Sequence, residues 1–197
     1  MNDAPTDSRL WIATFLEAQA AERGASANTQ AAYARDLSDV SDWMERAKLT
    51  FTKAARADIE NYLIYCDAQG LARSTRARRL SAIKQLYRFA FEEGWRDDNP
   101  ALQIKGPGRE ARLPGTLSHN DVERLITAAH NHGRSPSDRA RNTCLMELLY
   151  ATGMRVSELV SLPVSAARGD PQMLLVMGKG GKERMVPLSP AAREALA

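Results

Sequence analysis

Residues 151–188 read ATGMRVSELVSLPVSAARGDPQMLLVMGKGGKERMVPL and carry the clearest pattern of secondary structure in the chain. This stretch starts with a small-residue turn, and helical spacing predicts a short helix over 155–162. Two apolar runs follow, at 173–177 and 185–188, which are typical of β-strands. Between them lies GKGGKE at 178–183, where the glycines favour a tight connection between strands. The pattern predicts a basic β-hairpin behind a short helix.

Two helix starts lie upstream of this stretch and one lies downstream. Ser118 and Asp121 have the spacing of a capping box. Ser135-Pro136-Ser137-Asp138 combines a cap, a proline at the first helical position and an acid in the first turn. Ser189-Pro190 opens a further helix over 190–197. Residues 117–197 are therefore expected to form helices around one hairpin, the beginning of an α+β domain.

The first hundred residues carry four helical patterns, each with the apolar stripe of a core-facing helix. In the third pattern Leu63 is expected to be buried, and in the fourth Phe91 is expected to point inward. Glycine supplies the stop signals. The expected helices run over 9–23 with Gly24 as the stop, from a cap at Asn28, from about 55 to Gly70, and over 74–93 before Gly94.

A linker separates the two helical regions. Residues 105–115 read KGPGREARLPG, in which glycine, proline and charge are mixed without periodicity. The domains are expected at 1–103 and 117–197, joined by 104–116. The fold class is mainly α, with a four-helix amino-terminal domain.

Composition places the chain among ordinary globular proteins. Apolar residues make up 44% and charged residues 26%, and the aromatic content of 6% predicts mostly aliphatic cores. No apolar run is long enough to span a bilayer, and the start has no secretory pattern, so a soluble, cytoplasmic protein is expected. Cys66 and Cys144 sit in apolar helical patterns and suggest neither a disulfide nor a metal site.

Basic residues are concentrated on the fourth helix. The net charge is only +3, but most of the 27 basic residues are arginines, which suit bidentate phosphate recognition. Residues 73–88 contain no acid, so i,i+4 pairs within that segment cannot neutralise its basic side chains. The segment is predicted to bind a polyanion through Arg73, Arg76, Arg78, Arg79, Lys84 and Arg88.

Arg155 and Glu158 form the first candidate site. An arginine at the start of a helix can reach an anion, and a carboxylate one turn later can orient its guanidinium. Gly153 is expected to allow a close backbone approach. Taken alone, this spacing also fits a surface ion pair, and the hairpin alone also fits a solvated loop.

Taken together, in this order behind a basic helical domain, these segments resemble the boxes of the tyrosine site-specific recombinases, specifically the Xer type. The resemblance covers about residues 10–188. It implies transesterification at a DNA phosphodiester through a covalent 3′-phosphotyrosyl intermediate, without a cofactor. It further implies that Arg155 binds the non-bridging oxygens, that Lys179 is the general acid for the 5′-oxygen, and that Glu158 holds Arg155.

The same resemblance implies the partners. The first domain resembles the family's SAM-like core-binding domain, which closes on one face of double-stranded DNA while the catalytic domain takes the other. A related Xer subunit is the expected protein partner, and the first domain leans towards the D-like member of such a pair. The implied DNA contacts are Thr29, Gln30, Arg73, Arg76, Arg78, Arg79 and Lys84 in the first domain, and Lys182 and Arg184 on the hairpin.

The chain departs from the family pattern after the hairpin. The family's His-x-x-Arg pair, a further His or Trp and the nucleophilic tyrosine follow the hairpin, and residues 189–197 contain none of them. All three histidines and all five tyrosines precede Arg155, and the tyrosines are expected in the core or in a groove. The expectation is a recombinase without the rest of its catalytic domain, monomeric, that binds DNA but does not cleave it. The alternatives are a naturally truncated DNA-binding relative, a phage or integron integrase, and a protein-interaction domain with an incidental basic face.

Overall fold

The computed structural model divides the chain into two units, Met1–Ala111 and Arg112–Ala197, which are described separately below. The division falls inside the expected linker, 104–116. Part of that linker lies outside the described residues, as does Gly24. The structure describes residues 7–23, 27–108, 115–169 and 171–197.

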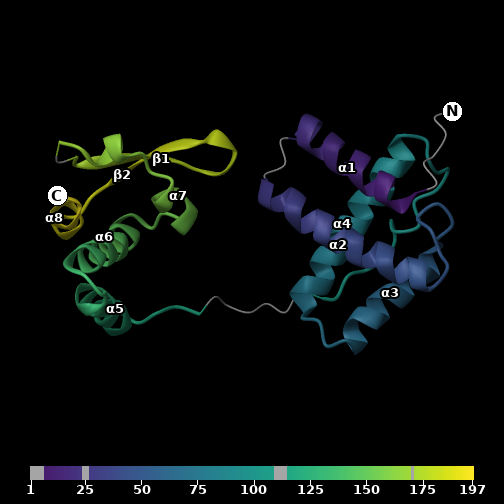
Figure 1. Cartoon of the computed structure of the whole chain (residues 1–197), viewed down its shortest axis with the longest axis horizontal. Coiled ribbons are helices and arrows are strands. Elements are labelled where there is room, and N and C mark those ends of the chain that lie inside the picture. The colour runs from purple at the N-terminus through teal and green to yellow at the C-terminus, as the bar shows by residue number, and fades with distance from the viewer. Residues whose placement is uncertain (1–6, 24–26, 109–114, 170) are drawn as a thin grey trace. The chain divides into compact units, whose positions relative to one another are not determined.

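The first unit is helical, and its last helix lies at the centre of the packing. Helix α4 contacts each of the other three, which together form one core (Figure 1). Gly70 and Gly94 follow α3 and α4 with φ of 73° and 70°, in the left-handed conformation that glycine favours at a helix end. The helices are α1 (Ser8–Arg23), α2 (Ala27–Arg46), α3 (Arg56–Ala68) and α4 (Arg73–Glu92).

The core of this unit is aromatic as well as aliphatic. Trp11 stacks on Phe51 with ring centroids 6.0 Å apart and contacts Trp95 at 5.1 Å and the edge of Tyr87 at 6.4 Å. The expectation of mostly aliphatic cores is therefore wrong for the first unit. The low aromatic content misled because every aromatic residue except Tyr150 lies before residue 112.

Three local expectations in the first unit need correction. Asn28 lies inside the first turn of α2 and does not precede it, because the helix begins at Ala27. On α3 the fully buried side chains are Ile59, Tyr62 and Cys66, and Leu63 is only half-buried. On α4 the inward stripe continues to Ala90, which leaves Phe91 51% exposed at its edge.

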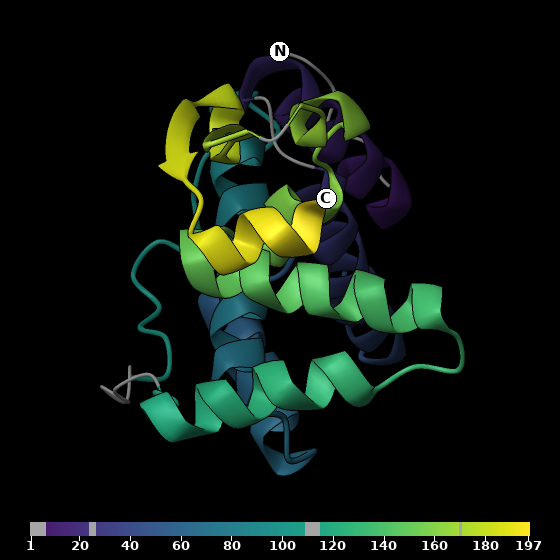
Figure 2. The same cartoon turned by 90° about the vertical axis from the view of Figure 1, so that its left-hand side faces the viewer.

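The second unit stacks three helices beside the hairpin. Helix α6 lies between α5 and α8 (Figure 2). The capping box predicted at Ser118 with Asp121 is formed, and the helix start predicted at Ser135 is present, with a capping box to Asp138. The elements are α5 (His119–Asn131), α6 (Pro136–Thr152), α7 (Val156–Val160), the 3-10 turn η1 (Val164–Ala167), β1 (Met173–Met177), the 3-10 turn η2 (Lys179–Gly181), β2 (Glu183–Pro187) and α8 (Pro190–Leu196).

The predicted hairpin is present, with β2 starting at Glu183, two residues before the expected run. The strands are antiparallel, and Val176 pairs with Arg184. Alternate residues Leu174, Val176 and Val186 are buried in a core to which α6, α7 and α8 also contribute. The hairpin is thus fixed against helices, which a lone two-stranded hairpin requires for stability.

The described residues contain no membrane-spanning helix, no group of metal-binding side chains and no disulfide. None of their helices is long and apolar enough to cross a membrane. Their His, Cys, Asp and Glu side chains form no group of three that could hold a metal ion. Cys66 is buried and Cys144 is partly buried, and both are free thiols.

Candidate active site and DNA-binding face

The start of α7 brings Arg155 and Glu158 together. Glu158 Oε2 accepts a hydrogen bond from the Arg155 backbone N–H at 2.8 Å, and Oε1 accepts one from Arg155 Nη1, also at 2.8 Å. Gly153 ends α6 with φ of 61°, which turns the chain into this position. An added Cβ at Gly153 would meet no other atom of the protein within 4 Å, so within the unit it is the φ that favours glycine here.

A third side chain from the hairpin completes this cluster. Arg184 Nη2 donates to Glu158 Oε2 at 2.7 Å, and Nη1 donates to Oε1 at 3.1 Å. The Glu158 side chain is only 5% exposed and receives four hydrogen bonds, which satisfy a buried carboxylate. The Arg155 side chain is 68% exposed and uses one terminal nitrogen in the cluster. Its remaining donors are available to an anion.

This arrangement makes the second unit sensitive to acid. The hydrogen bonds from Arg184 and from the Arg155 backbone lower the pKa of Glu158 to about 2. The pKa of a glutamate in an unfolded chain is about 4.3. A lowered folded-state pKa adds stability above the unfolded value, and that stability disappears as the pH falls towards 2.

We expect Glu158→Gln to remove this part of the acid dependence. The unfolding free energy of the wild-type chain should fall between about pH 5 and the pKa of about 2, whereas that of the variant should change less over the same range. Urea titrations of both proteins across that range measure the difference. Parallel curves for the two proteins would show that Glu158 is not ionised and paired as described.

The hairpin turn places the backbone of Lys179 next to this cluster. Gly178 N donates to the Lys182 carbonyl at 2.7 Å and closes the turn. Gly180 and Gly181 adopt φ of 75° and 72°, which glycine tolerates without strain. The side chain of Lys179 lies outside what the structure describes, and Lys182 is exposed. The structure therefore joins Arg155, Glu158 and Arg184 and positions the turn that carries Lys179.

Several basic residues of α4 form ion pairs inside the unit, and Arg79 makes the largest set of contacts. Arg79 is 16% exposed and contacts both carboxylate oxygens of Asp39, on α2. It also donates to Tyr62 Oη at 2.9 Å and to Cys66 Sγ at 3.5 Å, both on α3. Burial and the hydrogen bond to Asp39 raise the pKa of Tyr62. Arg79 thus links three helices.

Two neighbours of Arg79 are also paired inside the unit. Arg76 is 16% exposed and pairs with Asp67 at 2.6 Å. Arg78 is 44% exposed and pairs with Asp36, which is 4% exposed. Burial raises the pKa of Asp36, although Arg78 acts to lower it. These pairs do not follow from the i,i+4 spacing within α4, because the acids lie on other helices, α2 and α3.

We expect Arg79→Ala to destabilise the first unit by about 2 kcal/mol, because it leaves Asp39 and Tyr62 without their shared donor. Arg88→Ala is the matched control on the same helix. Arg88 pairs with Glu92 at the surface, and its loss should cost under about 0.5 kcal/mol. Urea unfolding followed by circular dichroism measures both values. Equal small losses would show that Arg79 has no structural role.

The other predicted contacts lie nearer the solvent. Arg73 and Thr29 are exposed, Gln30 is half-buried, and Lys84 is half-buried with its Nζ 3.4 Å from the Leu102 carbonyl oxygen. Their contact with DNA stays a prediction.

The tyrosines are not all core or groove residues. Tyr62 and Tyr87 are buried, and Tyr33 is partly buried. Tyr150 on α6 is 51% exposed, with its Oη 3.3 Å from His119 Nδ1. Tyr65 is also exposed. Tyr65 and Tyr150 therefore lie outside the core.

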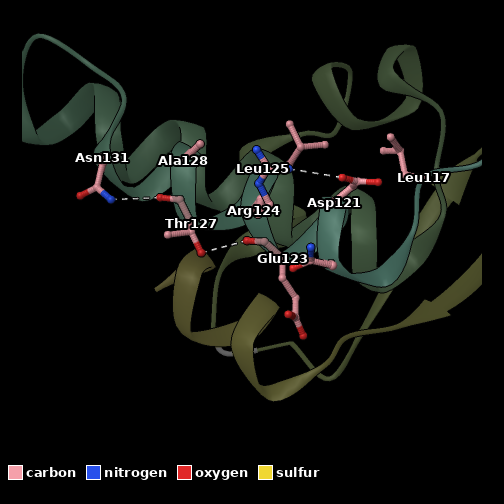
Figure 3. A pocket seen from close by; sticks show the side chains of 9 residues that line it. Leu117, Asp121, Glu123, Arg124, Leu125, Thr127, Ala128 and Asn131 are labelled. Carbon is pink, nitrogen blue, oxygen red and sulfur yellow. Dashed lines mark hydrogen bonds and ion pairs between the residues drawn. The ribbon is translucent and has the colours of Figure 1, made fainter.

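A hollow of about 800 Å³ runs along α5 (Figure 3), and none of the residues that line it belongs to the Arg155–Glu158–Arg184 cluster. Its lining comes from α5 and from Leu117. The polar groups there bond within the helix: Thr127 Oγ1 donates to the Glu123 carbonyl at 2.9 Å, and Asn131 Nδ2 donates to the Thr127 carbonyl at 3.1 Å. The hollow offers no cluster of groups for catalysis.

Comparison with protein families gives two matches. Residues 12–94 match the phage integrase, N-terminal SAM-like domain, and residues 115–197 match the phage integrase family.

Curated relatives match both units. Tyrosine recombinase XerD of Bradyrhizobium diazoefficiens is 45% identical over 204 aligned residues, which cover 100% of this chain and 64% of the relative. Tyrosine recombinase XerD of Rhizobium meliloti is 46% identical, with 96% of this chain and 62% of the relative covered. The chain thus spans less than two thirds of the length of these relatives.

Solved structures share the fold. The XerH site-specific recombinase bound to difH substrate, in a pre-cleavage complex, has a TM-score of 0.72 at 20% identity and covers 100% of this chain and 68% of that one. A lambda integrase tetramer bound to a Holliday junction has a TM-score of 0.70 at 19% identity and covers 95% and 54%. At these identities the likeness concerns the fold alone.

Proposed function

Because the chain belongs to the phage integrase family, the tyrosine site-specific recombinases, and resembles its Xer type, we propose that the protein carrying it recombines DNA at a specific site. Chromosome dimer resolution with a related Xer subunit is the proposed role. The names of the XerD relatives support the D-like assignment. The observation that carries the proposal is the Arg155–Glu158–Arg184 cluster beside the Lys179 turn.

The proposed reaction is an exchange of phosphodiester bonds. A tyrosine phenoxide attacks the DNA phosphorus, an O–P bond to tyrosine forms, and the P–O5′ bond breaks. Arg155 binds the non-bridging oxygens, where negative charge grows in the transition state. Lys179 donates a proton to the departing 5′-oxygen. The bond energy is kept in the 3′-phosphotyrosyl link, so the reaction needs no cofactor.

The first unit is proposed to hold the duplex. Arg73 and Lys84, with Thr29 and Gln30, are the proposed contacts, and their side chains are exposed or half-buried. Arg78 can contact phosphate only while it also neutralises buried Asp36. Arg76 and Arg79 are proposed to support the surface from within and not to touch DNA.

A binding titration at several salt concentrations tests this proposal. The 197-residue chain should bind a duplex carrying a Xer-type site more tightly than a scrambled duplex. Arg73→Ala and Lys84→Ala should each reduce the slope of log affinity against log salt by about 0.9, the value of one phosphate contact. Arg168→Ala, an exposed residue of the second unit, is the charge-matched control and should leave the slope unchanged. Salt-insensitive binding, or none, would contradict DNA binding by this chain.

Residues 1–197 alone are proposed to bind without cleaving, because no tyrosine in them follows the hairpin, where the family carries its nucleophile. Incubation with the same duplex should leave no covalent DNA adduct on this chain. An adduct that Tyr150→Phe removes would overturn this proposal, since Tyr150 is the exposed tyrosine of the second unit.

A further inference from the structure

Arg184 lies on the inner face of the hairpin, with its side chain 39% exposed. Residues of β2 alternate, and Arg184 shares its side of the strand with buried Val186. Across the hairpin it pairs with buried Val176. A side chain with this direction extends into the unit, towards α7, and meets Glu158 there.

The two arginines that share Glu158 use it differently. Arg184 places both terminal nitrogens on the carboxylate, the side-on geometry that fixes both partners. Arg155 places one terminal nitrogen there and keeps a more exposed side chain. Arg184 is thus suited to hold the carboxylate, and Arg155 is suited to bind an incoming anion.

The Arg184–Glu158 pair also lies close to Gly178, in the turn of the hairpin. The position of a Cβ at Gly178 would be 3.2 Å from Arg184 Nη1 and 3.5 Å from Glu158 Oε1. Gly178 directly precedes Lys179, so the turn lies against the Arg184–Glu158 pair. A side chain larger than glycine would displace one of them.

We propose that Arg184 is a positioning residue: through Glu158 it fixes the Arg155 guanidinium, and through Gly178 it fixes the turn that carries Lys179. The group proposed to bind the non-bridging oxygens and the group proposed to protonate the 5′-oxygen are thereby held in a fixed arrangement, although they come from different elements. This replaces the sequence-based expectation that Arg184 contacts the DNA backbone. The catalytic consequence rests on the proposed function, but the positioning itself does not.

The first test uses the 197-residue chain without DNA. Arg184→Lys keeps the charge but loses the two parallel hydrogen bonds. In spectra of arginine-labelled protein, the Arg155 side-chain N–H signals should shift or average, and amide exchange at Gly178 should accelerate by about tenfold or more. Arg168→Lys is the matched control and should change neither. A thermal melt shows whether each variant is folded, and Arg184→Met, which keeps the apolar stem, replaces Arg184→Lys if that variant unfolds.

The second test uses the intact protein. Arg184→Lys should slow cleavage by about 100-fold, the cost of displacing reacting groups by about 1 Å, and should leave duplex affinity within about twofold. Loss of affinity with unchanged Arg155 signals would show a direct DNA contact and overturn the proposal. Unchanged signals, amide exchange and cleavage would also overturn it. If the wild-type protein fails to cleave, the proposed function fails, while the spectra still decide the positioning role.

Discussion

Arg155→Ala in the intact protein should lower the rate of DNA strand cleavage by about 1,000-fold. The guanidinium is exposed and is held by Glu158, so it is oriented before the substrate arrives. Its contact with the phosphate strengthens as charge develops in the transition state. Affinity for the uncleaved site should therefore change by less than about threefold. Cleavage of a nicked duplex and a gel shift on the same duplex measure the two effects.

The controls for Arg155 separate chemistry from folding. Arg168→Ala removes an exposed arginine from the same unit and should preserve cleavage. Arg155→Lys retains the charge without the planar donor pair and should recover only part of the rate. Equal losses of cleavage and binding in Arg155→Ala, together with a lowered melting temperature, would assign Arg155 a folding role instead.

Lys179→Ala should reduce cleavage of normal DNA by about 1,000-fold, because the 5′-oxygen then leaves without a proton. A substrate with sulfur in place of that bridging oxygen should restore most of the rate, since a thiolate needs little protonation to leave. The initial rates of both proteins on both substrates give the rescue as a ratio.

Arg155→Ala is the matched comparison on the sulfur substrate. It should remain slow, because charge still develops on the non-bridging oxygens. Failure of sulfur to rescue Lys179→Ala would show that Lys179 does not protonate the leaving group. Rescue of both variants alike would remove the distinction between their roles.

Local features of the fold follow well from the sequence. The capping boxes at Ser118 and Ser135 and the helix stop at Gly153 depend on neighbouring residues only, and all are formed. The hairpin was also predicted, because strand patterns and glycine turns are local. The start of α2 differs by a residue or more from the prediction, because Asn28, expected as the cap, lies inside the helix.

Contacts between distant elements do not follow from local patterns. Arg79 meets Asp39, and that pairing depends on how α4 packs on α2. The basic run on α4 therefore gave no sign that Arg76, Arg78 and Arg79 form ion pairs inside the unit.

The core-facing position of Arg184 on β2 could be predicted from the sequence. The period-2 alternation of the strand puts Arg184 on the face of Val186, opposite the side expected of a DNA contact. A basic residue at a core-facing strand position indicates a buried partner. The identity of that partner, Glu158, required the fold.

Covalent capture shows whether the intact protein cleaves DNA through a tyrosine. The intact protein is incubated with a nicked duplex carrying a Xer-type site, and the protein–DNA adduct is isolated and digested to find which DNA end is attached. We predict a tyrosine joined to a 3′-phosphate, with a free 5′-hydroxyl on the departing strand. Attachment to a 5′-phosphate, or no adduct where a gel shift shows the site to be occupied, would contradict the assignment of this chain to a DNA-cleaving recombinase.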